Sequence, residues 1–384
     1  CIRDRSGRVS SVVASRSIGP WETRQMRVVV VGAGIVGASA AFHLADAGAD
    51  VIVADGSHEG TATRAGAGII CPWPTASTDE EFVALYVAAA EALPRIVERM
   101  EARGGGDSSY RRIGAIVLAT DEGRADRHLD EVEQRVRRRS SGSEVIGEIC
   151  RIDGVEVRRR FPPARSDLSG LWIDGGARLD GRAMQAALLR AAGVEPRRGR
   201  AELIARDDRV TGVVVGGEPI EADAVVVAGG AWTRELLEPL GITVDVEPQK
   251  GQILHLDVES RSERSVTGEW PSLLPLGPHY LVPFEGGRVV VGATRETGSG
   301  FDTRITAAGQ REVLDAALEW APGLADATVA ETRVGLRPLA ASGRPTLGPI
   351  DGVEGLVVGT GLGASGLTIG PLAGRMLAQQ IVQE

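Results

Sequence analysis

Lysine is almost absent from this 384-residue chain: Lys250 is the only one, and arginine carries the rest of the fixed positive charge. Acidic residues outnumber basic ones, so the formal net charge at pH 7 is -9. An acidic surface lacks the attraction that nucleic acids and anionic membranes require, and we expect neither as a partner. The arginine-rich run Arg135–Arg139 is interpreted as a solvated helix face.

Cysteine is scarce as well, with only Cys1, Cys71 and Cys150 in the chain. Their number is odd, and no two have the spacing of a metal or redox pair. We therefore expect no metal site and a reducing cytoplasm as the compartment. Cys71 is interpreted as a buried structural thiol.

Long apolar runs are also missing. No stretch has the length of a membrane span, and residues 1–25 lack the hydrophobic centre of a signal peptide. We expect those residues to form a disordered leader, and whether they belong to the mature protein stays open. The chain is long and 43% hydrophobic, which predicts two domains with sizeable cores.

What the chain does have is a strand–helix–strand unit near its beginning. The run Arg27–Val31 predicts a strand buried on both faces, Gly32, Gly34 and Gly37 open a helix, and a second strand ends at Asp55. The glycines allow a tight turn, close approach of a pyrophosphate, and close helix packing. A phosphate is favoured at the helix N-terminus, and the carboxylate of Asp55 is expected to accept hydrogen bonds from a ribose.

A second glycine turn of the same spacing follows a hydrophobic run more than 300 residues later, in "GLVVGTGLGASGLTIG", Gly355–Gly370. Between the two turns, Gly60–Ile70 is a run of small residues, which suits a long ligand passing close to the backbone. Later segments alternate in the manner of antiparallel strands with glycine hairpins. Residues 80–102, 180–193 and 307–321 are predicted helices, and Asp180 can cap the start of the second.

Several motifs in this order resemble those of the D-amino-acid oxidase and glycine oxidase superfamily of flavoproteins, which includes D-amino-acid dehydrogenases and sarcosine oxidases. They are "VVGAGIVGASAAFHLA", "TATRAGAGI", "ADAVVVAGGAW", "HYLVPFEGGRVVVGAT", "GLRP" and "GTGLGASGLTIGP". The resemblance implies a mixed α/β fold, with a Rossmann-like FAD-binding domain and a substrate domain built on an antiparallel sheet. We assign residues 26–85, 150–243 and 330–384 to the first domain and 86–149 and 244–329 to the second.

The resemblance also implies which residues contact FAD. The first turn would hold the diphosphate, Ala201 would touch the adenine through its backbone, and the second turn would face the pyrimidine edge of the flavin. The implied FAD-binding residues are Gly32, Gly34, Ile35, Val36, Gly37, Asp55, Gly56, Ala62, Thr63, Ala67, Gly68, Ile69, Ala201, Gly229, Trp232, Gly361, Leu362, Gly363, Ala364, Ser365, Gly366, Leu367 and Thr368.

For the substrate, the resemblance implies that Arg337 clamps a carboxylate and that Tyr280 reaches the same molecule, although core packing is an alternative for the tyrosine. No residue need act as a catalytic base, because the flavin carries the chemistry. Two features depart from related sequences. Ala364 stands where glycine oxidases often carry an arginine, and no cysteine follows Cys150, which favours noncovalent FAD.

These expectations lead to an FAD-dependent enzyme that oxidises a D-amino acid or glycine to an imino acid, which water converts to a 2-oxo acid and ammonia. The electron acceptor would be oxygen or a quinone-like carrier. Oxidation of a secondary amine such as sarcosine or proline, an NAD(P)-dependent dehydrogenase and a non-catalytic flavin protein stay open. So do the oligomeric state and, for a dehydrogenase, a place at the surface of the inner membrane.

Overall fold

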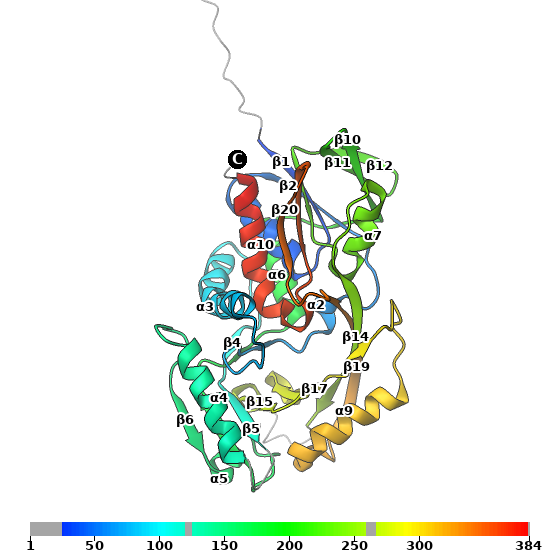
Figure 1. Ribbon diagram of the computed structural model, residues 1–384. Coiled ribbons are helices and arrows are strands. Elements are labelled where there is room, and N and C mark those ends of the chain that lie inside the picture. Colours follow the sequence, from blue (N-terminus) through cyan, green and yellow to red (C-terminus); the bar gives the residue numbers. More distant parts are fainter. Residues whose placement is uncertain (1–24, 120–124, 259–265, 383–384) are drawn as a thin grey trace, which may run out of the picture.

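The computed structural model describes residues 25–119, 125–258 and 266–382, so nearly all of the expected leader lies outside the described residues. Within these ranges the strands form two nine-stranded sheets and one three-stranded sheet. In Figure 1 the first large sheet occupies the upper half of the molecule and the second the lower half. Among the helices described, none combines the length and apolar character needed to cross a membrane.

The first sheet has a parallel centre. Strand β1 (Arg27–Val31) pairs with β2 (Asp50–Asp55) on one side and with β13 (Ala224–Val227) on the other, and β13 pairs with β21 (Val353–Thr360). The valines of β1 are at most 4% exposed, because the strand is covered on both faces, as the sequence predicts. The other strands of this sheet are β9 (Arg197–Arg198), β10 (Ala201–Arg206), β11 (Arg209–Val215), β12 (Glu218–Glu221) and β20 (Thr346–Ile350).

Helices from both ends of the chain share one core beside this sheet. They are α1 (Ile35–Asp46), α3 (Glu80–Ala102), α6 (Gly181–Ala192) and α10 (Gly366–Val382). Helices α1 and α10 meet closely, since a Cβ added at Gly374 would lie 2.5 Å from the backbone nitrogen of Ala40. The hydroxyl of Ser39 donates a 2.6 Å hydrogen bond to the carbonyl of Pro371. The two glycine-turn helices are therefore neighbours in space.

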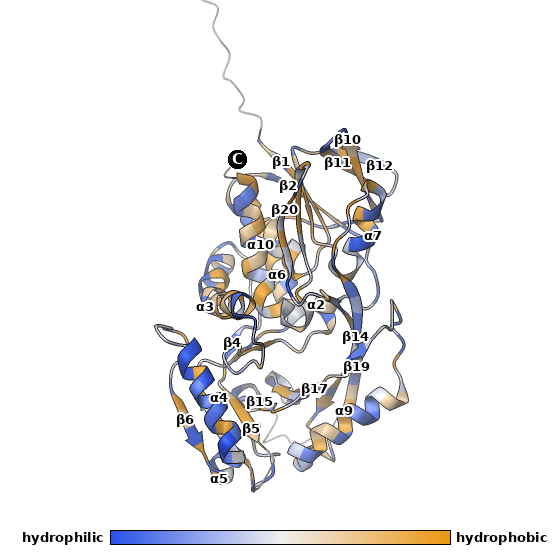
Figure 2. Ribbon diagram, in the orientation of Figure 1, coloured by the Kyte–Doolittle hydropathy of each residue, from blue (hydrophilic) through white to orange (hydrophobic). Residues whose placement is uncertain are grey.

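The second sheet is mainly antiparallel, as predicted, and its longest strands are β14 (Glu247–Asp257) and β19 (Thr328–Leu339), which pair along their whole length. Helix α9 (Ala307–Trp320) packs on this sheet. Helix α4 (Ala125–Arg139) lies at the outer edge of this half of the molecule and is largely hydrophilic (Figure 2). The remaining strands are β5 (Ala115–Ala119), β6 (Ile149–Ile152), β7 (Ser169–Ile173), β15 (Ser272–Pro275), β16 (Tyr280–Pro283), β17 (Arg288–Gly292) and β18 (Glu296–Thr297).

A small sheet of short strands joins segments from different parts of the chain: β3 (Ile69–Ile70), β8 (Ala177–Arg178) and β4 (Arg111–Arg112). The remaining helices are α2 (Ala62–Ala65), α5 (Gly154–Arg160) and α7 (Thr233–Leu237). The predicted cap of α6 is confirmed, because the carboxylate of Asp180 accepts hydrogen bonds from the backbone of Arg182 and Ala183 at 2.9 and 3.2 Å.

Sheet membership departs from the expected division of the chain. Strand β7 and most of β6 fall within residues 150–243, and most of β19 within 330–384, yet all three strands belong to the second sheet. The boundary expected at residue 85 also falls inside α3. Pairing partners are set by distant segments, so local alternation alone could not assign these strands. The division into two domains itself stays a prediction.

The arginine run on α4 is only partly a solvated face. Arg139 is partly buried, and its guanidinium donates hydrogen bonds to the carbonyls of Trp73, Thr75 and Ser77. The interpretation as a solvated face is therefore wrong for this residue, which fastens the segment after β3 to the helix.

Candidate active site

A cavity of about 740 Å³ lies where the parallel strands of the first sheet end and the second sheet begins. Its wall includes the last residues of β1, β2 and β21, which are Val31, Asp55 and Thr360, and Ala228, which directly follows β13. The second sheet contributes residues of β14, β16 and β19 to the opposite side. Ligands of open α/β sheets bind at the carboxyl ends of the strands, so this is the position expected of a nucleotide site.

The first glycine turn forms one wall of the cavity. Gly32 has a φ of +102°, and a Cβ there would lie 2.3 Å from the carbonyl oxygen of Ala228, so only glycine fits between β1 and β13. Helix α1 begins after Gly34 with neither a side-chain cap nor an acidic residue in its first turn. Its N-terminus faces the cavity, where the helix dipole favours an anion.

Asp55 lies beside this turn and also holds it in shape. Its carboxylate accepts hydrogen bonds from the backbone nitrogens of Ala33 and Ser57, each at 2.7 Å. Each carboxylate oxygen has a second lone pair, which leaves acceptors for a ligand hydroxyl. The ribose contact stays a prediction, and the structural role of Asp55 is one that the sequence analysis missed.

The run of small residues lines the cavity between the two glycine turns. The hydroxyl of Thr63 accepts a 2.9 Å hydrogen bond from the backbone of Ile35, which ties this run to the start of α1. Gly68 has a φ of +82°, and a Cβ there would lie 1.7 Å from the carbonyl of Leu179. Small residues are therefore required by neighbouring protein segments as well as by any ligand in the cavity.

The second glycine turn reaches the same cavity from the other end of the chain. It forms the short helix η6 (Gly363–Ser365), which runs directly into α10, and again has no side-chain cap. No acidic residue lies in the first turn of α10. Thr368 donates a 3.1 Å hydrogen bond to the carbonyl of Ile69, which connects this turn to the run of small residues. Two uncapped helix N-termini thus face one cavity.

Nearly all of the predicted site residues line the cavity; the exceptions are Gly37, Gly361 and Ser365. Gly37 serves packing, because a Cβ there would lie 1.8 Å from the carbonyl of Gly32. Gly361 has a φ of +82°, and a Cβ there would approach the backbone of Pro345 at 3.1 Å. Direct contact of the other predicted residues with FAD stays a prediction.

Arg337 and Tyr280 lie together at the second-sheet side of the cavity. The Arg337 guanidinium donates hydrogen bonds to the carbonyls of Thr294 and Lys250 at 3.1 and 3.4 Å. Burial lowers the pKa of Arg337 and raises the pKa of Tyr280, which also share a side-chain hydrogen bond. In the part of the chain that the structure describes, Arg337 has no carboxylate partner. Its charge is therefore available to a ligand.

The cavity wall also contains residues that the sequence analysis missed. Tyr86 of α3 is one, and burial raises its pKa although its hydroxyl interacts with the side chains of Ser365 and Thr368. His58 is another, stacked on predicted Trp232 with ring centres 4.5 Å apart. No local pattern marks either residue, because each reaches the site through tertiary packing.

Cys71 lies outside the cavity wall, in the core between β3 and the second sheet. Burial raises the pKa of its thiol to about 12, so the interpretation as a buried structural thiol is confirmed. Over the described residues, no group of histidine, cysteine or acidic side chains could hold a metal ion.

The residues present fit a flavin dinucleotide. An elongated ligand with a diphosphate and a ring that gains negative charge suits two uncapped helix N-termini at one cavity. The glycines leave backbone N–H groups accessible, and apolar side chains such as those of Ile35 and Leu367 line the space between the turns.

Comparisons with known proteins agree with this geometry. The model of the DAO family, described as FAD dependent oxidoreductase, matches residues 27–380. The uncharacterized oxidoreductase YurR of Bacillus subtilis is 41% identical over 92% of this chain and 94% of its own length. Glycine oxidase of Pseudomonas aeruginosa is 30% identical over 92% of this chain and 93% of its own. The crystal structure of iminodiacetate oxidase from Chelativorans sp. BNC1 matches with a TM-score of 0.88 and 46% identity, covering 93% of this chain and 96% of that one. The chain therefore belongs to the DAO family of FAD-dependent oxidoreductases, which act on amino-type substrates.

Proposed function

We propose that the protein oxidises a small amino acid between its Cα and nitrogen, with noncovalently bound FAD as the first electron acceptor. The observation that supports this most strongly is the guanidinium of Arg337, which has no carboxylate partner among the described residues and lies beside Tyr280 in the cavity that both glycine turns reach. A planar guanidinium binds a carboxylate through two parallel hydrogen bonds, which fixes the orientation of the attached Cα.

The protein's own part in the reaction is orientation. Arg337 holds the carboxylate, and the backbone carbonyls of Lys250 and Thr294 hold the guanidinium in place. The chemistry supplied by bound FAD is acceptance of the hydride that leaves Cα. The substrate amine reacts in its neutral form, so no base on the protein is required, and water converts the imino acid to a 2-oxo acid and ammonia or an amine.

The substrate of the first proposal is glycine or a D-amino acid. Oxidation of a secondary amine such as sarcosine, proline or iminodiacetate is the second candidate, and the 46% identity to iminodiacetate oxidase favours it. The same steps follow, except that an acyclic secondary amine releases a primary amine in place of ammonia, and the cyclic imine from proline keeps its nitrogen in the product. Oxygen or a quinone-like carrier then reoxidises the cofactor.

For FAD itself we propose the arrangement implied by the sequence. The first turn and the small-residue run would lie along the diphosphate, Asp55 at the ribose and Ala201 at the adenine. The turn at Leu362–Thr368 would lie at the pyrimidine edge of the flavin, where its N–H groups stabilise negative charge.

Anaerobic mixing of the purified yellow protein with glycine, D-alanine, sarcosine, proline and iminodiacetate tests the proposal. A substrate bleaches the flavin absorbance. Arg337→Ala is expected to lower kcat/KM for that substrate by about 10²- to 10⁴-fold, because two charge-assisted hydrogen bonds are lost. Arg311→Ala, a change at an exposed arginine of α9, is the matched control. Unchanged kcat/KM in Arg337→Ala would disprove the clamp.

A further inference from the structure

A second arginine, Arg295, lines the cavity at the same end as Arg337 and Tyr280. Arg295 lines the cavity and is also exposed to solvent, so it lies where the cavity opens to solvent. Burial is the main cause that lowers the pKa of Arg337, and the positive charge of Arg295 adds to it. The two guanidiniums are therefore close enough to influence one another.

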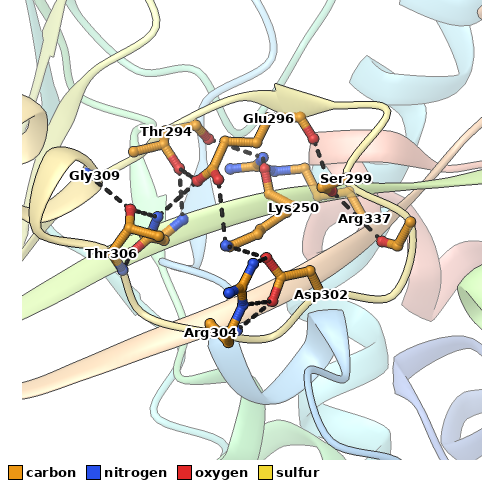
Figure 3. A network of polar contacts seen from close by, with 11 residues as sticks. Lys250, Thr294, Glu296, Ser299, Asp302, Arg304, Thr306, Gly309 and Arg337 are labelled. Carbon is orange, nitrogen blue, oxygen red and sulfur yellow. Dashed lines mark hydrogen bonds and ion pairs between the residues drawn. The ribbon is translucent and has the colours of Figure 1, made fainter.

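The backbone that carries Arg295 is fixed on both sides. Thr294 accepts a 2.9 Å hydrogen bond from the backbone of Gln252, and its hydroxyl donates a 2.7 Å bond to Glu296. Glu296 also accepts a 2.7 Å bond from the side chain of Gln252. Figure 3 shows the side chains of Thr294 and Glu296 turned toward each other, with a dashed line joining Glu296 to Lys250. Since alternate side chains of an extended chain point in opposite directions, Arg295 between them is directed away from this network and into the cavity.

The network around Lys250 is balanced in charge. Lys250 is 1% exposed and forms ion pairs with Glu296 and Asp302, each at 3.3 Å, and Asp302 also pairs with Arg304 at 2.9 Å. Two positive and two negative side chains thus neutralise one another behind the cavity wall. Neither acid is left to neutralise Arg295.

Among the described residues, no acidic side chain lines the arginine end of the cavity, and Glu296, whose charge acts on Arg337, lies behind the wall in its ion pair with Lys250. The acids in the cavity wall are Asp55, Glu202 and Glu235, and all three come from the first-sheet side, at β2, β10 and α7. Among the residues that the structure describes, neither Arg295 nor Arg337 forms an ion pair. Two positive charges therefore face the space beside Tyr280. An amino acid with one carboxylate neutralises only one of them.

We propose that Arg295 binds a second carboxylate of the substrate, so that the preferred substrate class is an amine or amino acid that carries two carboxylates. Arg337 holds the carboxylate next to the reacting carbon, and Arg295 holds the distal one at the mouth of the cavity. The inference rests on the proposed function for the reaction itself, but the anion-binding geometry can be measured without turnover.

The binding test uses oxydiacetate, which has two carboxylates and no amine, and methoxyacetate, which has one. Both are titrated calorimetrically into the FAD-loaded protein. Oxydiacetate is expected to bind about 10- to 30-fold more tightly, as one additional charge-assisted contact allows. Arg295→Ala abolishes this preference, Arg295→Lys keeps part of it, and Arg311→Ala leaves it unchanged. Equal affinity for the two probes, or a preference that survives Arg295→Ala, overturns the assignment.

Turnover then separates this inference from the proposed function. The kcat/KM for iminodiacetate is compared with that for sarcosine, and the kcat/KM for D-aspartate with that for D-alanine. Arg295→Ala is expected to lower kcat/KM at least about 10-fold for the dicarboxylate of a pair and less than about 3-fold for the monocarboxylate. If no amine is oxidised while the oxydiacetate preference depends on Arg295, the proposed function fails and the second carboxylate site stands. If a monocarboxylate is the better substrate and Arg295→Ala has no effect, the second site fails and the oxidase function stands.

Discussion

Gly374 is the position where convergence of the two glycine turns can be tested most directly. A Cβ there would lie 2.5 Å from the backbone nitrogen of Ala40 and 2.6 Å from the carbonyl oxygen of Val36, both in α1. Ordinary contacts begin at 3.4 Å, so in Gly374→Ala helices α1 and α10 must separate by 0.9 Å to relieve the shorter one. Alanine gains about 1 kcal/mol over glycine in a helix, whereas overpacking costs about 1 to 3 kcal/mol. The third obstructing atom is the Cβ of Ser39, and neither a Cβ nor a backbone atom can rotate away, so we expect a net loss.

The loss should appear in FAD binding as well as in stability. In the proposed arrangement of FAD, the bound dinucleotide contacts both turns and needs them at one spacing, whereas without FAD the helices can separate and relieve the contact. If about 1 to 2 kcal/mol of this strain is imposed on binding, the Kd for FAD rises about 5- to 30-fold. The assay is quenching of flavin fluorescence on titrating apoprotein, with thermal melting of both forms.

Gly277→Ala is the matched control, because Gly277 is exposed and a Cβ there would have no neighbour within 4 Å. It should leave the Kd unchanged. A Gly374→Ala protein that binds FAD and melts like the parent would refute the reasoning, since it would mean that the spacing of the two helices does not govern the site.

Three further predictions concern buried polar groups. Burial lowers the pKa of His43 from 6.5 to about 4, so the unfolded chain takes up a proton at a higher pH than the folded protein does. About 2 kcal/mol of the free energy of unfolding is therefore lost as the pH falls to 5. Thermal melting between pH 7 and pH 5 should show a smaller loss of stability in His43→Phe and the parent's loss in the exposed control His128→Phe. Cys71 should resist iodoacetamide at pH 8 until guanidinium is added, which peptide mass spectrometry detects, and its alkylation in active protein would contradict its burial. Lys250→Met leaves Glu296 and Asp302 without their buried cation and should lower the free energy of unfolding by about 3 kcal/mol. Denaturant unfolding should show that the double variant Lys250→Met/Glu296→Gln recovers part of this loss. A double variant no more stable than Lys250→Met would count against the network.

Features that depend on local chemistry could be predicted from the sequence. The valine run of β1, the turn at Gly32 and the Asp180 cap are each marked in the sequence by residues within a few positions of one another, and all three appear in the structure. Arg337 and Tyr280 were found only through the resemblance to a family. Nothing in an arginine before a proline distinguishes a ligand-binding side chain from one in an ion pair.

Features that depend on long-range packing could not be predicted. Tyr86 reaches the site because α3 packs on α10, and Arg139 is drawn from solvent by three carbonyls more than 60 residues earlier in the chain. Arg295 stands in an exposed stretch after a strand, and only the hydrogen bonds of Thr294 and Glu296 on either side reveal its direction. The sequence shows which residues could take part in such a network, but it does not show which of them contact one another.

The two sides of the cavity differ in how they can change. On the side of the first sheet, the cavity is lined by backbone at glycine turns. Most substitutions of these glycines would clash with neighbouring backbone, as the close contacts at Gly32 and Gly68 show. The second sheet offers the side chains of Tyr280, Arg295 and Arg337, and the last of these is anchored to backbone carbonyls that any sequence retains. A change at position 295 therefore alters the charge at the second-sheet side of the cavity without disturbing the glycine turns that we propose to face the cofactor. On this arrangement one FAD-binding frame can support the oxidation of amines that differ in their number of carboxylates, and substrate preference should follow the few exposed side chains at the mouth.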